Sequence, residues 1–153
     1  MEGIELIKHN PGAPLLRVLG LGPNLKPVKA VDQLQTLFDS NTFWARGRTK
    51  KTLQKMLANS CSIVTMWKQN QLIGFGRATS DLTYRAVLWD VVIKNDYQKL
   101  GLGKILLESL INSKSIKNVE KTYLMTTNCK DFYKSCGFSE LEFQTLLYKT
   151  LKI

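Results

Sequence analysis

The sequence predicts an α+β fold in which helices pack against one mixed, mostly antiparallel sheet. Segments with strand-like and helix-like apolar spacing follow one another in the order β-α-α-β-β-β-α-β-α-β. The long apolar strand at 84–93 leads through a short polar connection into an amphipathic helix at 103–113. At 153 residues the chain is long enough for one domain with a sizeable core, so we expect residues 1–153 to form a single domain.

The N-terminal third predicts one strand and two helices. Residues 3–26 are rich in turn-forming residues, and the apolar run at 15–19 fits one strand there. Pro27 can start a helix, which the helical spacing of the apolar residues between 31 and 38 continues. Thr49 can cap a second helix through its hydroxyl group.

The rest of the chain predicts most of the sheet. Segments 62–67 and 71–78 form a hairpin about Gln69 and Asn70, and the long strand and its helix follow. Segment 121–127 predicts a fifth strand. A short helix at 131–136, ended by Gly137, and a closing strand at 142–151 complete the order.

The most informative motif is the loop at 98–103, which reads QKLGLG and opens the helix after the long strand. Two glycines let the backbone approach a ligand closely, and the first amides of a helix are free and carry the positive end of its dipole. A pyrophosphate fits such a site. A second Gly-x-Gly, at 20–22, has no helix after it and predicts only a turn.

Composition excludes several classes of function. The chain has 22 Lys and Arg against 12 Asp and Glu, giving a net charge of +10, which would attract a polyanionic ligand or nucleic acid. The densest basic cluster, at 46–55, is more typical of a solvated helix face. His9 is the only histidine, so we expect neither a histidine triad nor a metal site. The three cysteines show no CxxC spacing, and we expect them to be reduced.

No apolar run is long enough to span a bilayer, and the N-terminus lacks the pattern of a signal or transit peptide. We therefore expect no membrane partner and a cytoplasmic protein.

A second constellation lies about 30 residues after the loop. Segment 128–138 reads NCKDFYKSCGF, a strand-end Asn, a short helix bearing Phe-Tyr, and Gly-Phe after it. Together with the QKLGLG loop, this segment resembles the GNAT N-acetyltransferase superfamily. The resemblance implies the GNAT fold, with about six or seven strands and about four helices, and acetyl-CoA as co-substrate.

The resemblance also implies where acetyl-CoA binds: at the end of the long strand, in the loop and on the short helix. The implied residues are Val91, Val92, Ile93, Gln98, Lys99, Leu100, Gly101, Leu102, Gly103, Lys104, Asn128 and Tyr133.

Acetyl transfer needs a hydrogen-bond donor that stabilises the oxyanion, a general acid and a general base. We expect the Val92 amide to hold the thioester carbonyl where the strand splays from its neighbour, and Tyr133 to protonate the departing sulfur. The family's glutamate position corresponds here to Val87, which has no carboxylate. Asp90 is the only acid in the strand, either as a base or as a hydrogen-bonded structural carboxylate, and period-two alternation places it with Leu88 and Val92.

Four stretches, at 43–48, 76–81, 84–90 and 123–127, resemble the cyanobacterial and plastid N-acetyltransferase group that includes plant-type serotonin N-acetyltransferases. This implies cyanobacterial cytoplasm or plastid stroma and direct transfer to an arylalkylamine such as serotonin. Trp44, Tyr84 and Trp89 would form an aromatic wall, although core packing explains them equally well.

Three alternatives stay open: a protein lysine or N-terminal acetyltransferase, an inactive acyl-CoA-binding module, and a basic nucleic-acid-binding domain. We expect no nucleic-acid partner, and either a monomer or a homodimer.

Overall fold

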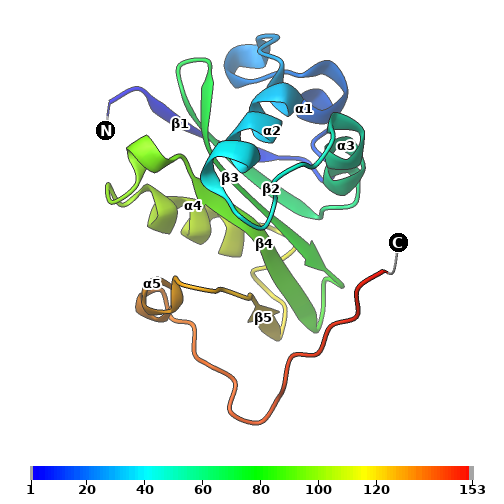
Figure 1. Cartoon of the computed structure of the whole chain (residues 1–153), viewed down its shortest axis with the longest axis vertical. Coiled ribbons are helices and arrows are strands. Elements are labelled where there is room, and N and C mark those ends of the chain that lie inside the picture. The colour runs from blue at the N-terminus through cyan, green and yellow to red at the C-terminus, as the bar shows by residue number, and fades with distance from the viewer. Residues whose placement is uncertain (1, 152–153) are drawn as a thin grey trace.

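A computed structural model describes residues 2–151 and contains one five-stranded sheet (Figure 1). The strands are β1 (Ile4–His9), β2 (Ser62–Lys68), β3 (Gln71–Ser80), β4 (Arg85–Ile93) and β5 (Lys121–Tyr123). They lie in chain order across the sheet; the first four are antiparallel to their neighbours, and β5 is parallel to β4. The predicted α+β class and mostly antiparallel sheet are confirmed, with five strands in place of six or seven.

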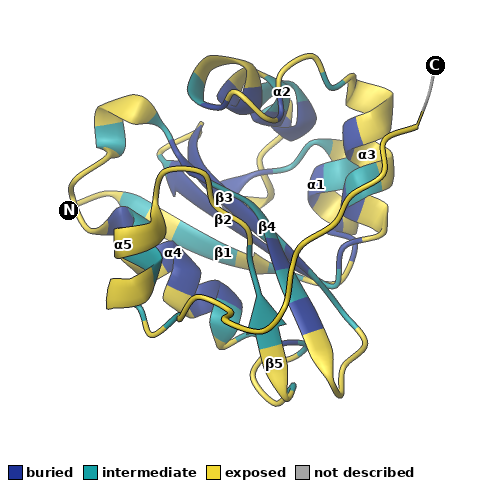
Figure 2. Ribbon diagram, turned by 60° about the horizontal axis from the view of Figure 1, so that its bottom comes forward, coloured by how far each residue is buried: buried dark blue, intermediate teal, exposed yellow. Residues whose placement is uncertain are grey.

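Helices cover both faces of the sheet (Figures 1 and 2). They are α1 (Pro14–Leu19), α2 (Ala30–Asn41), α3 (Lys50–Ala58), α4 (Leu102–Ile111) and α5 (Lys130–Ser135), with 3₁₀ turns η1 (Pro23–Leu25) and η2 (Asn95–Tyr97). The first three helices enclose one core, built around Phe38, Trp67 and Phe75. A second core lies under α4 on the other face, and α5 packs against its edge.

Three predicted elements form where their local chemistry places them. The side-chain oxygen of Thr49 accepts a hydrogen bond from the Thr52 amide at 3.2 Å and starts α3. The apolar stripe at 31–38 is buried on α2, and β2 and β3 turn at Gln69, whose φ is +54°. These elements confirm the predicted helices and hairpin, although α2 begins at Ala30 and not at Pro27.

The N-terminus differs from the prediction. Residues 15–19 lie in α1, because Pro14 occupies its first turn and Gly20, at φ +65°, ends it. The first strand is β1 instead, which pairs with β2 along one edge of the sheet. This strand was not predicted because its polar and apolar residues are mixed, half-exposed and adjacent to turn-forming residues.

The predicted closing strand at 142–151 is also wrong. Within the described residues this segment has no regular structure, and Phe143 and Tyr148 are 95% and 90% exposed (Figure 2). A strand needs a partner for its backbone groups, and none of the described strands pairs with this segment. The predicted strand at 121–127 is shorter for the same reason, since its ladder to β4 ends at Tyr123.

Strands β4 and β5 form a wedge. Their parallel ladder contains three residue pairs and ends at Val87 and Tyr123, whereas β4 continues to Ile93. In the described sheet the last part of β4 is therefore paired on one side alone, with β3, and its other edge lies open. We call this gap the β4–β5 opening.

Candidate functional site

The segment after β4 is fixed at both ends. The Gln98 side-chain amide donates hydrogen bonds to the Ile93 carbonyl at 3.0 Å and to Asn95 Oδ1 at 3.1 Å. The Asn95 amide donates to Asn41 Oδ1, at the end of α2, at 2.8 Å. Gln98, predicted to touch acetyl-CoA, therefore anchors the loop to the end of β4.

The loop presents a row of free amides. Among the described residues, the backbone N–H groups of residues 99–104 make no hydrogen bond to the chain. Lys99 and Gly101 have φ values of +62° and +81°, which turn the backbone just before α4 begins at Leu102. Free amides at the positive end of a helix dipole form an anion site. The side chains of Lys99 and Lys104 are exposed there.

The two sequence motifs meet in space. A Cβ atom on Gly103 would lie 3.4 Å from Phe132 Cζ, so α5 packs beside the first turn of α4. Tyr133 is the next residue on α5, and its ring packs edge-on against the Phe132 and Phe138 rings, at centroid distances of 5.1 and 6.0 Å. The structure thus brings the loop and the Tyr133 helix together.

Tyr133 lies in surroundings that keep its hydroxyl protonated. Burial raises its pKa to about 12, and the nearby Cys129 and Cys136 thiols add to the rise. A phenol with this pKa is a proton donor throughout the neutral range.

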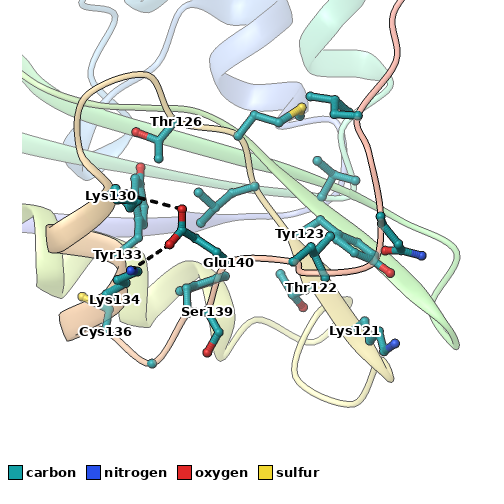
Figure 3. Close-up of a pocket in the computed structure, with 18 of the residues that line it drawn as sticks. Lys121, Thr122, Tyr123, Thr126, Lys130, Tyr133, Lys134, Cys136, Ser139 and Glu140 are labelled. Carbon is teal, nitrogen blue, oxygen red and sulfur yellow. Dashed lines mark ion pairs between the residues drawn. The ribbon is translucent and has the colours of Figure 1, made fainter.

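A pocket of about 1300 Å³ lies in front of Tyr133, between β4, β5, α5 and residues 139–146 (Figure 3). Val87 and Trp89 line it from β4, and Tyr123 lines it from β5. At its rim, Glu140 forms ion pairs with Lys130 at 3.4 Å and with Lys134 at 2.9 Å. The strands that line this pocket, β4 and β5, are the same strands that border the β4–β5 opening.

Asp90 lies at a bulge in β4. Arg77 pairs with Trp89 and Phe75 with Val92, so β4 has one more residue than β3 in this interval, and Asp90 has a φ of +54°. The bulge breaks the period-two alternation. Asp90 therefore shares a face with Trp89, toward α2 and α3, and not with Leu88 as predicted.

Both carboxylate oxygens of Asp90 are engaged. Oδ2 accepts a hydrogen bond from Arg77 at 2.8 Å and forms an ion pair with Arg48 at 3.1 Å, and Oδ1 accepts a hydrogen bond from Trp44 Nε1 at 3.1 Å. The side chain is 4% exposed. Burial acts to raise its pKa, but the hydrogen bonds and charges of Arg48 and Arg77 outweigh that effect and lower the pKa. A carboxylate held in this way is a weak base.

The backbone of β4 corrects the predicted oxyanion donor. The Lys94 amide donates to the Ile73 carbonyl on β3 at 2.7 Å. Beyond the bulge amides alternate in direction along the strand, so the Val92 amide also points to β3 and the Ile93 amide points to the β4–β5 opening. Val91 is the last residue of the bulge and directly follows Asp90.

The predicted aromatic wall is incomplete. Trp44 donates a hydrogen bond to Asp90, and the Arg77 guanidinium lies over the Trp89 ring. Tyr84 lies in the turn before β4, about 17 Å along the strand from Trp89. Asn128 is exposed, and its Oδ1 contacts the Cys129 thiol at 3.4 Å.

Sequence reasoning missed the two arginines that hold Asp90. Arg48 and Arg77 lie on separate segments, and only the register of β3 against β4 and the position of the α2–α3 connection bring them together. No local pattern marks them.

Within residues 2–151, no helix combines the length and the apolar character needed to cross a membrane.

Comparison with known sequences gives a consistent result. Residues 59–140 match the family described as Acetyltransferase (GNAT) domain. The uncharacterized N-acetyltransferase ycf52 of Pyropia yezoensis is 36% identical over 111 residues, which is 69% of this chain and 63% of that protein. The chloroplastic GCN5-related N-acetyltransferase 1 of Arabidopsis thaliana is 30% identical over 109 residues, 71% of this chain and 55% of that protein. The chain thus spans less than two thirds of these relatives.

A further relative is named histone acetyltransferase TAP1, from Glycine max; it is 40% identical over 74 residues, 46% of this chain and 31% of that protein. Among solved structures, a GNAT-family protein of Xanthomonas campestris superimposes with a TM-score of 0.73 at 18% identity, covering 99% of this chain and 95% of the other. A GNAT-family protein of Streptococcus pneumoniae gives a TM-score of 0.71 at 16% identity, with 97% and 99% covered. These structures share the fold.

Proposed function

Because the chain belongs to the GNAT acetyltransferase family, we propose that it transfers the acetyl group of acetyl-CoA directly to the nitrogen of a primary amine. One observation carries the proposal: the row of free amides at residues 99–104 lies beside the helix that presents Tyr133 to the pocket. An anion site and a proton donor stand next to each other, at the edge of a sheet that opens between β4 and β5.

The residues present fit acetyl-CoA. The amides of residues 99–104 would hold its pyrophosphate, with Lys99 and Lys104 adding positive charge. The polar pantetheine arm would extend along the open edge of β4 in the place of the missing strand partner, with the Ile93 amide as its hydrogen-bond donor. Asn128 stays a predicted contact.

Bound acetyl-CoA supplies a thioester carbonyl, and the chain supplies the groups around it. The Val91 amide donates a hydrogen bond to the carbonyl oxygen as charge develops there. The amine nitrogen forms a bond to the carbonyl carbon, the carbon–sulfur bond breaks, and Tyr133 gives its proton to the departing sulfur. The proton of the amine leaves to solvent.

Deprotonation of the amine is the step for which the protein offers the fewest groups that could accept the proton. An amine of pKa about 10.4 must lose a proton at pH 7, which costs about 4.6 kcal/mol. Val87 offers no carboxylate, and both oxygens of Asp90 are occupied by hydrogen bonds. We therefore assign the proton to water in the pocket and not to Asp90.

For the acceptor we propose an arylalkylamine. Phe43 and Trp44 form an exposed edge-to-face pair, with ring centroids 5.1 Å apart, beside the Asp90 cluster. A flat aromatic amine would stack there. A protein amine is the second candidate, supported by the relative named histone acetyltransferase. We place the protein in cyanobacterial cytoplasm or plastid stroma, in keeping with its Prochlorococcus and chloroplastic relatives.

The test is release of free thiol from acetyl-CoA with serotonin, tryptamine, a polyamine, and lysine-bearing and free N-terminal peptides. We expect turnover with the two arylalkylamines and little with the polyamine. Turnover with peptides alone would move the function to protein acetylation. Absence of turnover with every amine, while CoA still raises the unfolding temperature, would show an acyl-CoA-binding module and overturn the proposal.

A further inference from the structure

Asp90 has a backbone conformation that only a few residue types tolerate. Its φ of +54° lies in the left-handed region, which β-branched and bulky residues avoid and which Asp and Asn enter more readily. It is the extra residue of the β4 bulge, between the pairs Arg77–Trp89 and Phe75–Val92. The conformation of Asp90 therefore sets the direction of the next amide, that of Val91.

The carboxylate of Asp90 connects three segments. Arg77 reaches it from β3 at 2.8 Å, and Arg77 is itself 14% exposed. Arg48 and Trp44 reach it from residues 42–49, which connect α2 to α3. We call residues 42–49 the α2–α3 connection. It carries the exposed Phe43–Trp44 pair.

Three protein donors contact the Asp90 carboxylate, and its side chain is 4% exposed. Oδ2 is shared by two guanidinium groups, and Oδ1 accepts the indole N–H of Trp44. A base would need an oxygen within hydrogen-bond reach of the amine or of a water molecule that contacts it. Asp90 instead has the contacts of a residue that fixes other groups.

We propose that Asp90 is a positioning residue for acetyl transfer: its carboxylate holds the β4 bulge so that the Val91 amide faces the β4–β5 opening, and it fixes the α2–α3 connection beside that amide. This inference rests on the proposed function for its kinetic consequences. The link between the Asp90 carboxylate and the Val91 amide is a claim about the protein itself and can be tested without turnover.

Three substitutions separate positioning from base catalysis. Asp90→Asn keeps one oxygen and a residue type that tolerates positive φ; Asp90→Gly keeps the backbone freedom alone; Asp90→Ala keeps neither. For a positioning residue, we expect kcat to fall by about 3-fold in the Asn variant and by about 100-fold in the Ala variant, with Gly between them. The KM for acetyl-CoA should stay within about 2-fold, because the amides of residues 99–104 are unchanged.

The pH profile gives a second readout. In the Asn variant the acid side of the kcat/KM profile should keep its midpoint, because no essential base has been removed. Equal losses in all three variants, together with loss of the acid limb in the Asn variant, would show that Asp90 is the base and would overturn the proposal.

The matched control is Lys51→Gln, which removes an exposed charge on α3. Arg48→Gln tests whether the Asp90 carboxylate fixes the α2–α3 connection. It should raise the KM for the amine and leave the KM for acetyl-CoA unchanged, since it releases the α2–α3 connection and not the loop. An unchanged amine KM in this variant would contradict that part of the proposal.

A measurement on the wild-type protein and its variants without substrate keeps the inference separate from the proposed function. The Val91 amide resonance should move in Arg77→Gln, which removes a partner of the Asp90 carboxylate without changing the residue next to Val91, and stay in place in Lys51→Gln. A Val91 amide that stays in place in every variant would overturn the proposal even if the enzyme is active. Should Asp90→Ala fail to fold, the Asn and Gly variants provide the same kinetic comparison.

Discussion

Removal of the Tyr133 hydroxyl should affect the turnover rate directly. In Tyr133→Phe we expect kcat to fall by about 100-fold, because the departing sulfur loses its proton donor. The KM for acetyl-CoA should change little. Tyr148→Phe is the matched control, since that hydroxyl is on a side chain 90% exposed. Steady-state thiol release measures both.

Because burial raises the Tyr133 pKa to about 12, kcat should not decline on the alkaline side up to about pH 10 through loss of this proton. Equal activity of Tyr133→Phe and wild type would remove Tyr133 from the mechanism.

His9 makes a prediction about stability and pH. Its Nε2 lies 2.7 Å from Thr65 Oγ1, which also accepts the Trp67 indole N–H, and burial lowers its pKa from 6.5 to about 4. The unfolded chain therefore binds this proton first as pH falls. The free energy of unfolding therefore has its full value above pH 6.5 and decreases as the pH falls toward 4.

Between pH 7 and 4.5 we expect the free energy of unfolding to decrease by about 2 kcal/mol from this group. Urea unfolding at the two pH values measures the decrease, and His9→Gln should lose most of the pH dependence in this window. A variant with the same pH dependence as wild type would assign it to other groups.

Individual residues show where sequence reasoning stops. Gln98 and Gly101 could be placed because the motif that contains them is local. The direction of the Val92 amide and the face of Asp90 could not, because one extra residue in β4 reverses both and the bulge depends on how β3 pairs with it. The Arg48 and Arg77 contacts are equally non-local.

At the scale of elements, the start of α4 is the feature with the most direct test. Gly101→Ala adds a Cβ that meets no atom within 4 Å, but it strains a residue whose φ is +81°. We expect the affinity for CoA to fall by about 10-fold as the loop changes shape, because a loss of about 1.4 kcal/mol corresponds to that factor. Isothermal titration with CoA measures it.

Gly3→Ala is the control, with a φ of +78° and the same open surroundings. Both variants should lose a similar amount of thermal stability, and only Gly101→Ala should lose CoA affinity. Equal CoA affinities in the two variants would show that the loop shape does not contribute to binding.

Elements with strong apolar periodicity, a side-chain cap or a short turn could be predicted from the sequence. α2, α3, α4 and the β2–β3 hairpin belong to this group. Short elements could not be predicted: the five residues at 15–19, four of them apolar, suit a strand or a helix, and Pro14 and Gly20 favour the helix α1. We predicted a closing strand at 142–151, but the sequence of a segment supplies no pairing partner.

At the scale of the whole molecule, the net charge of +10 favours a polyanionic ligand. Long-range attraction speeds association and is screened by salt. We expect the association rate constant of CoA to fall by about 10-fold between 20 and 500 mM NaCl, with a smaller change in the dissociation rate constant. Stopped-flow fluorescence measures both rates, and uncharged pantetheine should show no salt dependence. A CoA association rate that does not depend on salt would show that the net charge does not contribute to association.

The early end of the β4–β5 ladder also affects how substrates reach the centre. A continuous sheet separates the side covered by α2 and α3 from the side covered by α4, whereas a sheet that parts beyond Val87 and Tyr123 connects them. With the proposed function, an acetyl donor at the start of α4 and an amine beside the α2–α3 connection would have separate entrances. Neither substrate would have to leave before the other enters, and the two products would have separate exits.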